Sequence, residues 1–282
     1  MTNSYLNIVT FLLTTLFYYL ALKPALPYSM YSDKEQYKTY ISNNYMYLAI
    51  YVLLVILIQF MVNSSIISSN CGGNITENMG AAGVLTFLPW ILIFGVLVLI
   101  LTVYPGFKSA FSDVVGYFYV SSTANKIITE LLVNKDIEGK IVADPNMTPE
   151  KKQALESAAD AIIKICGNTS ILINQMVPSN FDDYWGILRP LMKDKYQTDG
   201  PETDKMKNDL FEIVVTRDNV GEAMWYIYTG LLLTSIVQLK ITTRGCTSNP
   251  QTMQANYQKF LQQEQQNKQQ QESAQTTYTI TT

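Results

Sequence analysis

Long apolar stretches separated by polar segments dominate the first hundred residues of the chain and return once near residue 230. Four stretches are candidates for membrane-spanning helices: residues 5–22, 45–62, 84–104 and 223–241. A helix needs about 20 mainly apolar residues to cross a hydrocarbon core about 30 Å thick. Because backbone amides find no partner in lipid, each isolated apolar run is expected to be helical. The pattern predicts an all-α membrane protein with about four transmembrane helices.

The first and the last of these stretches also admit other interpretations. Residues 5–22 could be a signal peptide, but no basic residue precedes them and no small-residue cleavage site follows, which favours a retained span or anchor. Residues 223–241 carry Gln238 and Lys240 near their end, which leaves a buried helix of a soluble domain as the alternative. A lysine in a terminal turn can extend to the membrane surface, so we still expect insertion.

Residues 105–222 have the charge content of an ordinary soluble chain and are predicted to form an extramembrane domain. Thr148 begins one predicted helix, apolar residues from Phe181 onward recur at three- and four-residue spacing, and a third helix is expected over residues 203–216. The fold class is therefore all-α with a helical domain inserted before the last span. The predicted divisions are residues 1–104 with three spans and short loops, the helical domain at 105–222, the fourth span at 223–241 and a polar Gln-rich tail at 242–282.

Basic residues predict the orientation of the spans. The loop after the first stretch holds three lysines, the domain begins near Lys108, and residues 63–83 contain neither Lys nor Arg. Because cytosolic loops are enriched in Lys and Arg, the first loop and the domain are expected on the cytosolic side, with the N-terminus and the tail on the other. Lys240 and Arg244 fall on the non-cytosolic side in this arrangement and argue against it.

Composition narrows the possible functions. Of the 282 residues only 15 % are charged, against about 25 % in a typical soluble chain. Histidine, the commonest general base and metal ligand, is absent, and no basic stripe suggests a nucleic-acid partner. The acidic pairs Asp182–Asp183 and Asp209–Glu212 have no nucleophile or Gly-rich loop nearby, so solvated helix faces are favoured. We predict no enzyme, with no catalytic, cofactor-binding or metal-binding residues and no small-molecule substrate.

The first three stretches contain no charged residue. Ion-coupled transporters usually keep charged side chains within their spans, so this class is disfavoured. A small channel or transporter with an uncharged pore remains the alternative function. A membrane-bound enzyme and a fusion protein are further rivals, but the chain offers neither a convergent set of polar residues nor an apolar segment outside the four stretches.

Two of the three cysteines, Cys71 and Cys246, each lie a few residues beyond a predicted span and on the same side of the membrane. They could form a disulfide or remain two unrelated thiols, since the sequence does not supply the separation of their Cα atoms. Cys166 lies on the apolar face of the predicted helix after Thr148 and is expected in the domain core.

Two passages carry a resemblance to a known family. The first begins with Pro105-Gly106-Phe107-Lys108 and continues with Phe111, Ser112, Gly116 and Tyr117. The second contains Trp225-Tyr226 and Thr229-Gly230, followed by Ser235 and Cys246. Together they cover about a quarter of the chain and resemble a multi-span, minor capsid-associated virion membrane protein of the nucleocytoplasmic large DNA viruses. That family has Trp at the position of Phe107 and a Tyr-Asn pair at Gln238-Leu239.

The first passage has the properties of an elbow at the membrane interface. Pro105 and Gly106 would end the preceding span, Lys108 would meet lipid headgroups, and the side chains of Phe111, Tyr117, Phe118 and Tyr119 would lie along the interface. The predicted elbow residues are Pro105, Gly106, Phe107, Lys108, Phe111 and Tyr117. The second passage is a candidate for close packing of the last span, because three of its residues are small. The packing residues are Trp225, Tyr226, Thr229, Gly230 and Ser235.

The resemblance implies a structural protein of the virion that anchors its internal membrane to the capsid shell. Its implied partners are the lipid bilayer and other viral capsid or membrane proteins, and its implied location is the internal membrane of the virion. The resemblance also favours a disulfide between Cys71 and Cys246, because such viruses often encode their own thiol oxidation machinery.

Overall fold

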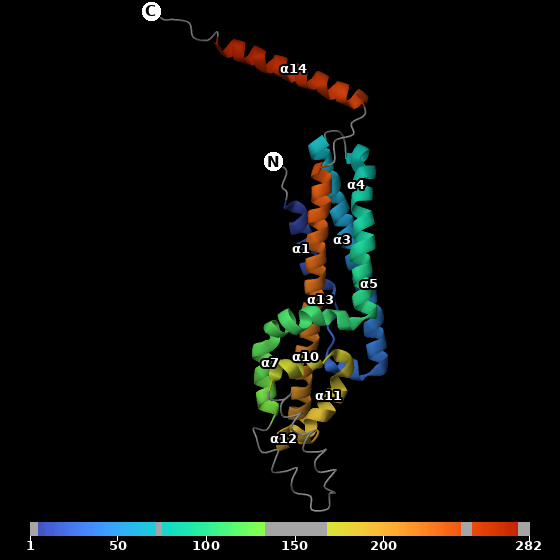
Figure 1. Ribbon diagram of the computed structural model, residues 1–282, viewed down its shortest axis with the longest axis vertical. Coiled ribbons are helices and arrows are strands. Elements are labelled where there is room, and N and C mark those ends of the chain that lie inside the picture. Colours follow the sequence, from blue (N-terminus) through green and yellow to red (C-terminus); the bar gives the residue numbers. More distant parts are fainter. Residues whose placement is uncertain (1–4, 72–74, 133–167, 244–249, 276–282) are drawn as a thin grey trace, which may run out of the picture.

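A computed structural model describes residues 5–71, 75–132, 168–243 and 250–275, and all named elements in these ranges are helical. The molecule is elongated, with a bundle of long helices, a domain of shorter helices at one end and helix α14 (Pro250–Gln275) at the other (Figure 1). The bundle contains α1 (Leu6–Phe17), the π-helical turn η1 (Tyr18–Leu22), α3 (Lys34–Cys71), α4 (Ile75–Pro89), the π-helical turn η2 (Trp90–Gly95), α5 (Val96–Val103) and part of α13 (Pro201–Thr243).

Three helical segments are long and apolar enough to cross a membrane: Lys34–Cys71, Asn78–Val103 and Pro201–Thr243. The first apolar segment, Leu6–Leu22, is helical but shorter. The expectation of an all-α chain with helices able to span a bilayer is confirmed for the described residues. The count of four spans stays a prediction.

Helix α13 is the longest element, with 43 residues. The domain helix predicted at 203–216 and the separate span predicted at 223–241 are joined in one helix without a break. No proline interrupts the helix after its first residue, and at 1.5 Å per residue it extends about 64 Å. The division at residue 222 is therefore not a structural boundary, because one helix serves both the domain and the bundle.

Helix α3 also extends beyond the predicted apolar run, since it begins at Lys34 rather than near residue 45. The side chain of Asp33 accepts hydrogen bonds from the backbone amides of Glu35 and Gln36 at 2.9 and 3.1 Å. This satisfies two amides that have no partner within the first turn, so the polar segment before the apolar run is stabilised as helix.

The centre of the bundle is filled by aromatic rings. Phe11, Tyr18, Tyr51, Trp90, Phe94 and Tyr226 are all buried there. Trp90, the first residue of η2, is fully buried, with its ring centroid 5.4 Å from that of Phe11 and 5.3 Å from that of Phe94. Pro89 directly precedes this π-helical turn.

The domain packs short helices around the N-terminal half of α13. Its elements are η3 (Pro105–Lys108), α6 (Ser109–Phe111), η4 (Ser112–Gly116), α7 (Tyr117–Leu131), α10 (Thr169–Gln175), η5 (Pro178–Asn180), α11 (Phe181–Leu188), η6 (Arg189–Leu191) and α12 (Asp194–Gln197). The predicted inward residues Phe181, Trp185, Leu188 and Met192 are all buried in one core. The predicted helix after Thr148, which includes Cys166, lies outside the described residues.

The first loop joins this domain. Helix α2 (Tyr28–Ser32) places the Tyr28 ring centroid 5.4 Å and the Tyr31 ring centroid 4.8 Å from that of Phe211 on α13. Lys207 forms an ion pair with Asp182 at 2.9 Å, and the hydroxyl of Tyr28 donates to the same carboxylate. The first loop and the domain therefore lie at the same end of the bundle.

Gly230 allows α1 to approach α13 closely. A Cβ atom at Gly230 would lie only 2.0 Å from Cζ of Phe11. We expect Gly230→Ala to force these helices apart and to reduce the free energy of unfolding by about 1–3 kcal/mol. Gly95→Ala is the matched control, because its new Cβ would have its nearest neighbour 3.8 Å away. Thermal unfolding of both variants in detergent tests this, and equal transition temperatures would contradict it.

Candidate functional site

Four charged side chains meet where the apolar bundle joins the helical domain. They come from three parts of the chain: Lys23 after η1, Lys108 at the end of η3, and Asp218 and Glu222 one turn apart on α13. The Lys23 ammonium lies 2.5 Å from one oxygen of Glu222, and that of Lys108 lies 2.8 Å from the other. Lys108 also pairs with Asp218 at 3.0 Å. We call these four residues the junction cluster.

The junction cluster is largely withdrawn from solvent and internally neutral. Its side chains are between 7 % and 15 % exposed, with two positive and two negative groups. Burial opposes the charged form of Lys108, but the carboxylates of Glu222 and Asp218 outweigh it and raise the lysine pKa above its ordinary value. The hydroxyl of Tyr19 donates to Glu222 at 3.1 Å. Because buried charges are costly unless paired and hydrogen-bonded, these contacts depend on one another.

Sequence reasoning missed this cluster. It placed Lys108 among lipid headgroups, whereas the structure directs Lys108 into the protein toward Glu222. Lys108 faces inward because Asp218 and Glu222 on α13 lie within ion-pairing distance of its ammonium. The sequence did contain a signal for the cluster, because Lys23, Lys108 and Glu222 each lie within four residues of one end of a predicted apolar stretch.

The other residues of the predicted elbow differ in exposure: some face outward and others pack against α13 or the domain. We use "elbow" for residues 105–118, the segment that runs from α5 to the start of α7 across the long axis of the bundle (Figure 1). Pro105 and Gly106 begin it and are exposed, as is the Phe107 side chain. The ring of Phe111 lies against Trp225, with centroids 5.0 Å apart.

Tyr117, expected along the interface, packs instead against the domain core, because α7 turns into the domain at this point. Trp225 Nε1 donates to the carbonyl oxygen of Phe107 at 2.9 Å, which ties the elbow to α13.

Two glycines allow the elbow to cross α13 in close contact. A Cβ at Gly116 would lie 2.5 Å from the carbonyl oxygen of Arg217, and one at Gly221 would lie 2.6 Å from Cβ of Ser112. Arg217 is buried and donates to the carbonyl oxygen of Ile173 on α10. The elbow, α10 and α13 are therefore held together within one turn of the junction cluster.

The residues predicted to pack the last span are not all in contact with other helices. Tyr226 is buried in the aromatic core, Gly230 lies against Phe11, and Thr229 is half-buried. Ser235 is exposed, and its hydroxyl donates to the carbonyl of Leu231 in its own helix. The expectation for Ser235 is corrected, because the neighbouring Thr234 occupies the buried side of α13 instead.

A second polar group lies within the bundle and joins four helices. Asn7 donates to Asn63 at 2.7 Å and to Gln238 at 3.3 Å. Asn63 donates to Thr86 at 2.8 Å, and Gln59 donates to the backbone carbonyl of Asn7 at 3.0 Å. We call these residues the amide layer. Along α13 the layer lies sixteen residues from Glu222, or about 24 Å. Such side chains hold helices together in an apolar environment.

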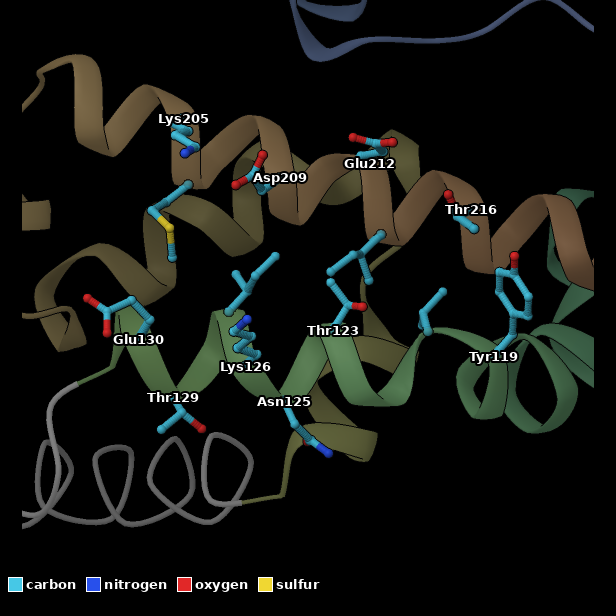
Figure 2. Close-up of a pocket in the computed structure, with 14 residues that line it drawn as sticks. Tyr119, Thr123, Asn125, Lys126, Thr129, Glu130, Lys205, Asp209, Glu212 and Thr216 are labelled. Carbon is cyan, nitrogen blue, oxygen red and sulfur yellow. The ribbon is translucent and has the colours of Figure 1, made fainter.

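A groove of about 1030 Å³ lies between α7 and the N-terminal half of α13 (Figure 2). Lys205, Asp209, Glu212 and Thr216 line it from α13, and Tyr119, Thr123, Lys126 and Glu130 line it from α7. Glu212 is exposed and Asp209 is half-exposed, in keeping with a solvated helix face. Within the described ranges, no cluster of three or more His, Cys, Asp or Glu residues could hold a metal ion.

We expect Glu222→Gln to destabilise the protein by about 3–5 kcal/mol, because it leaves two lysines without their shared carboxylate. Glu212→Gln is the control, since this exposed residue of the same helix should tolerate the change within about 0.5 kcal/mol. Denaturant unfolding in detergent measures both. If the two variants unfold at the same denaturant concentration, the cluster does not have the proposed stabilising role.

Cys71 is disulfide-bonded in the structure, and its predicted partner Cys246 lies outside the described residues. If the two are joined, Cys246→Ser should make Cys71 reactive toward an alkylating reagent without prior reduction. Cys166→Ser is the control and should leave Cys71 protected. Mass spectrometry of alkylated peptides reads the outcome, and a Cys71 that stays protected in Cys246→Ser would rule out this pairing.

Comparisons of the chain with protein-family models, curated proteins and solved structures found no significant match.

Proposed function

We propose that this chain is a structural membrane protein that anchors the internal membrane of a large DNA virus to the capsid shell. The observation that carries the proposal is the rigid joint between an apolar bundle and a helical domain. Helix α13 passes through both without a break, and the junction cluster ties Lys23 and Lys108 to it. An anchor requires this property, because a domain on a flexible linker would move independently of the membrane.

The proposed arrangement has four spans, with Leu6–Leu22 as the shortest. This segment packs against α13 through Phe11 and Gly230 and against α3 through Asn7 and Asn63. A helix embedded between two candidate spans and uncharged along its length is best placed in the same bilayer. In this arrangement the junction cluster lies at one membrane surface and the amide layer lies near the other.

On this proposal the surfaces available to capsid or membrane protein partners are the first loop, the domain and the tail helix α14. The first loop and the domain are joined through the contact of Tyr28 with Phe211. Helix α14 extends from the opposite end of the bundle (Figure 1). Its described side chains are exposed and largely polar, with Tyr257 and Phe260 among its few aromatic residues. A helix of this composition gains little from folding alone, so a partner would stabilise it.

The packing of the bundle supports an anchor over a channel with an uncharged pore. Phe11, Tyr51, Phe94 and Tyr226 meet at its centre, with the Tyr51 and Tyr226 centroids 5.6 Å apart. These buried rings fill the centre of the described bundle, which disfavours a path for hydrated ions there. The absence of histidine from the sequence likewise supports a structural rather than a catalytic role.

Cross-linking mass spectrometry on purified particles of the encoding virus tests the proposal. The exposed domain residues Lys126 and Lys205 should cross-link to a capsid protein in intact particles. After detergent removes the membrane, the chain should remain with the capsid fraction. Cross-links restricted to other copies of the chain or to soluble proteins would contradict an anchoring role. Ion flux through vesicles containing the purified chain would instead favour the channel.

A further inference from the structure

The outer face of the elbow carries an exposed apolar stripe. Phe107, Val114 and Phe118 are 56 %, 68 % and 82 % exposed, and Ala110 lies between them and is also exposed. Their spacing of three, four and four residues places them on one side of a helical segment. The stripe continues from the exposed side chain of Val103 at the end of α5.

The opposite face of the elbow is fixed, so the stripe cannot turn inward. Ser112 and Gly116 are buried one turn apart and lie directly against Gly221 and Arg217 of α13. A rotation of the elbow would drive side chains larger than glycine or serine into the backbone of α13. The geometry therefore holds Val114 and Phe118 away from the described protein.

Contacts with α13 set the level of the elbow along the bundle. Its Phe111 ring lies 5.0 Å from that of Trp225 and 6.0 Å from that of Tyr228. Tyr228 is six residues beyond Glu222 toward the bundle, or about 9 Å along the helix. The elbow thus crosses α13 at the level of the junction cluster, with Phe111 against the first apolar turns of α13 and Gly116 against Arg217 on the domain side. In a membrane this level corresponds to the headgroups and the upper acyl chains.

The chemistry of the stripe indicates the kind of lipid contact. It presents aromatic and aliphatic side chains, and the elbow's single lysine, Lys108, is already paired with Glu222 and Asp218. Attachment to lipid would therefore depend on burial of apolar surface rather than on attraction to anionic headgroups.

We propose that the elbow is inserted as a wedge into the domain-side leaflet and that it gives the protein a preference for membrane curved convexly toward the domain. This rests on the proposed function in one respect, that the bundle spans the bilayer. A segment inserted at headgroup depth in one leaflet adds area to that leaflet alone, which favours convex curvature on that side. At the other end of the bundle, α14 is mostly polar along its described length and has little apolar surface to insert.

Fluorescence quenching tests the insertion step. The full chain carrying Phe118→Trp is reconstituted into phosphatidylcholine vesicles that contain lipids brominated near the headgroup end of the acyl chain. Its added fluorescence should be quenched, whereas that of the control Ile187→Trp, at an exposed apolar position of the domain, should not. Equal and negligible quenching of the two would overturn the proposal and leave the stripe as a contact surface for another protein.

Membrane tubes drawn from giant phosphatidylcholine vesicles test the curvature step. Labelled chains with the domain outward should be enriched on tubes over flat membrane by at least about twofold. The variant Val114→Ser/Phe118→Ser should lose this enrichment, and Ile171→Ser/Ile187→Ser, which removes exposed apolar surface from the domain, should keep it. Replacement of the neutral lipid by anionic lipid should change little.

The outcomes separate this inference from the proposed function. If the wild-type chain resists extraction by alkaline carbonate but is equally dense on tubes and flat membrane, the wedge is overturned and the anchor is not. If carbonate extracts the chain, both are overturned. Val114→Ile/Phe118→Leu keeps the stripe apolar, so enrichment retained by this variant and lost by the serine variant supports the wedge even if the serine variant is less stable.

Discussion

Glu222 has to keep its negative charge at the point where α13 leaves the domain and enters the apolar bundle. A carboxylate in such a place is costly unless it is paired, and Lys23 and Lys108 supply the two partners at 2.5 and 2.8 Å. Each lysine follows a different apolar segment, so pairing both lysines with Glu222 holds three parts of the chain together. The junction cluster thus determines how the two halves of the molecule are joined.

Two levels of polar side chains in the bundle are separated by an aromatic core. The junction cluster forms one level, the amide layer around Asn63 forms the other about 24 Å away along α13, and the aromatic core that contains Trp90 fills the interval. In hydrocarbon, apolar packing alone does not fix the register of one helix against the next, because lipid tails are equally apolar. Hydrogen bonds from Asn7 to two other helices, and the ion pairs of Glu222, can fix it at both ends. The aromatic core then needs only to fill space.

The sequence allowed the elements dominated by hydropathy to be predicted, and it failed where distant residues decide the outcome. Apolar runs marked the bundle helices, and the spacing of Phe181, Trp185 and Leu188 marked a domain helix, because burial of one face is a local property. The continuity of α13 was missed, since a change from polar to apolar composition looks like a boundary although nothing in the backbone ends there. Lys108 was assigned to lipid because its partners on α13 are more than a hundred residues away. Pro105 and Gly106 predict the end of the preceding helix, and α5 ends at Val103, but the orientation of the elbow depends on Gly116 and Gly221 meeting α13.

Lys108 connects the two proposals, because it is part of the elbow and part of the junction cluster. Its neighbour Phe107 is exposed on the outer stripe, while its own ammonium faces inward to Glu222. A force on the domain that tilted α13 would move Glu222 and, through Lys108, the elbow with it. With the stripe in lipid, such a tilt would have to withdraw Phe107, Val114 and Phe118 from the leaflet, at a cost proportional to the apolar area exposed. Lipid contact and ion pairing would then resist the same motion, so the segment that gives the protein its preference for curved membrane would also stiffen the anchor.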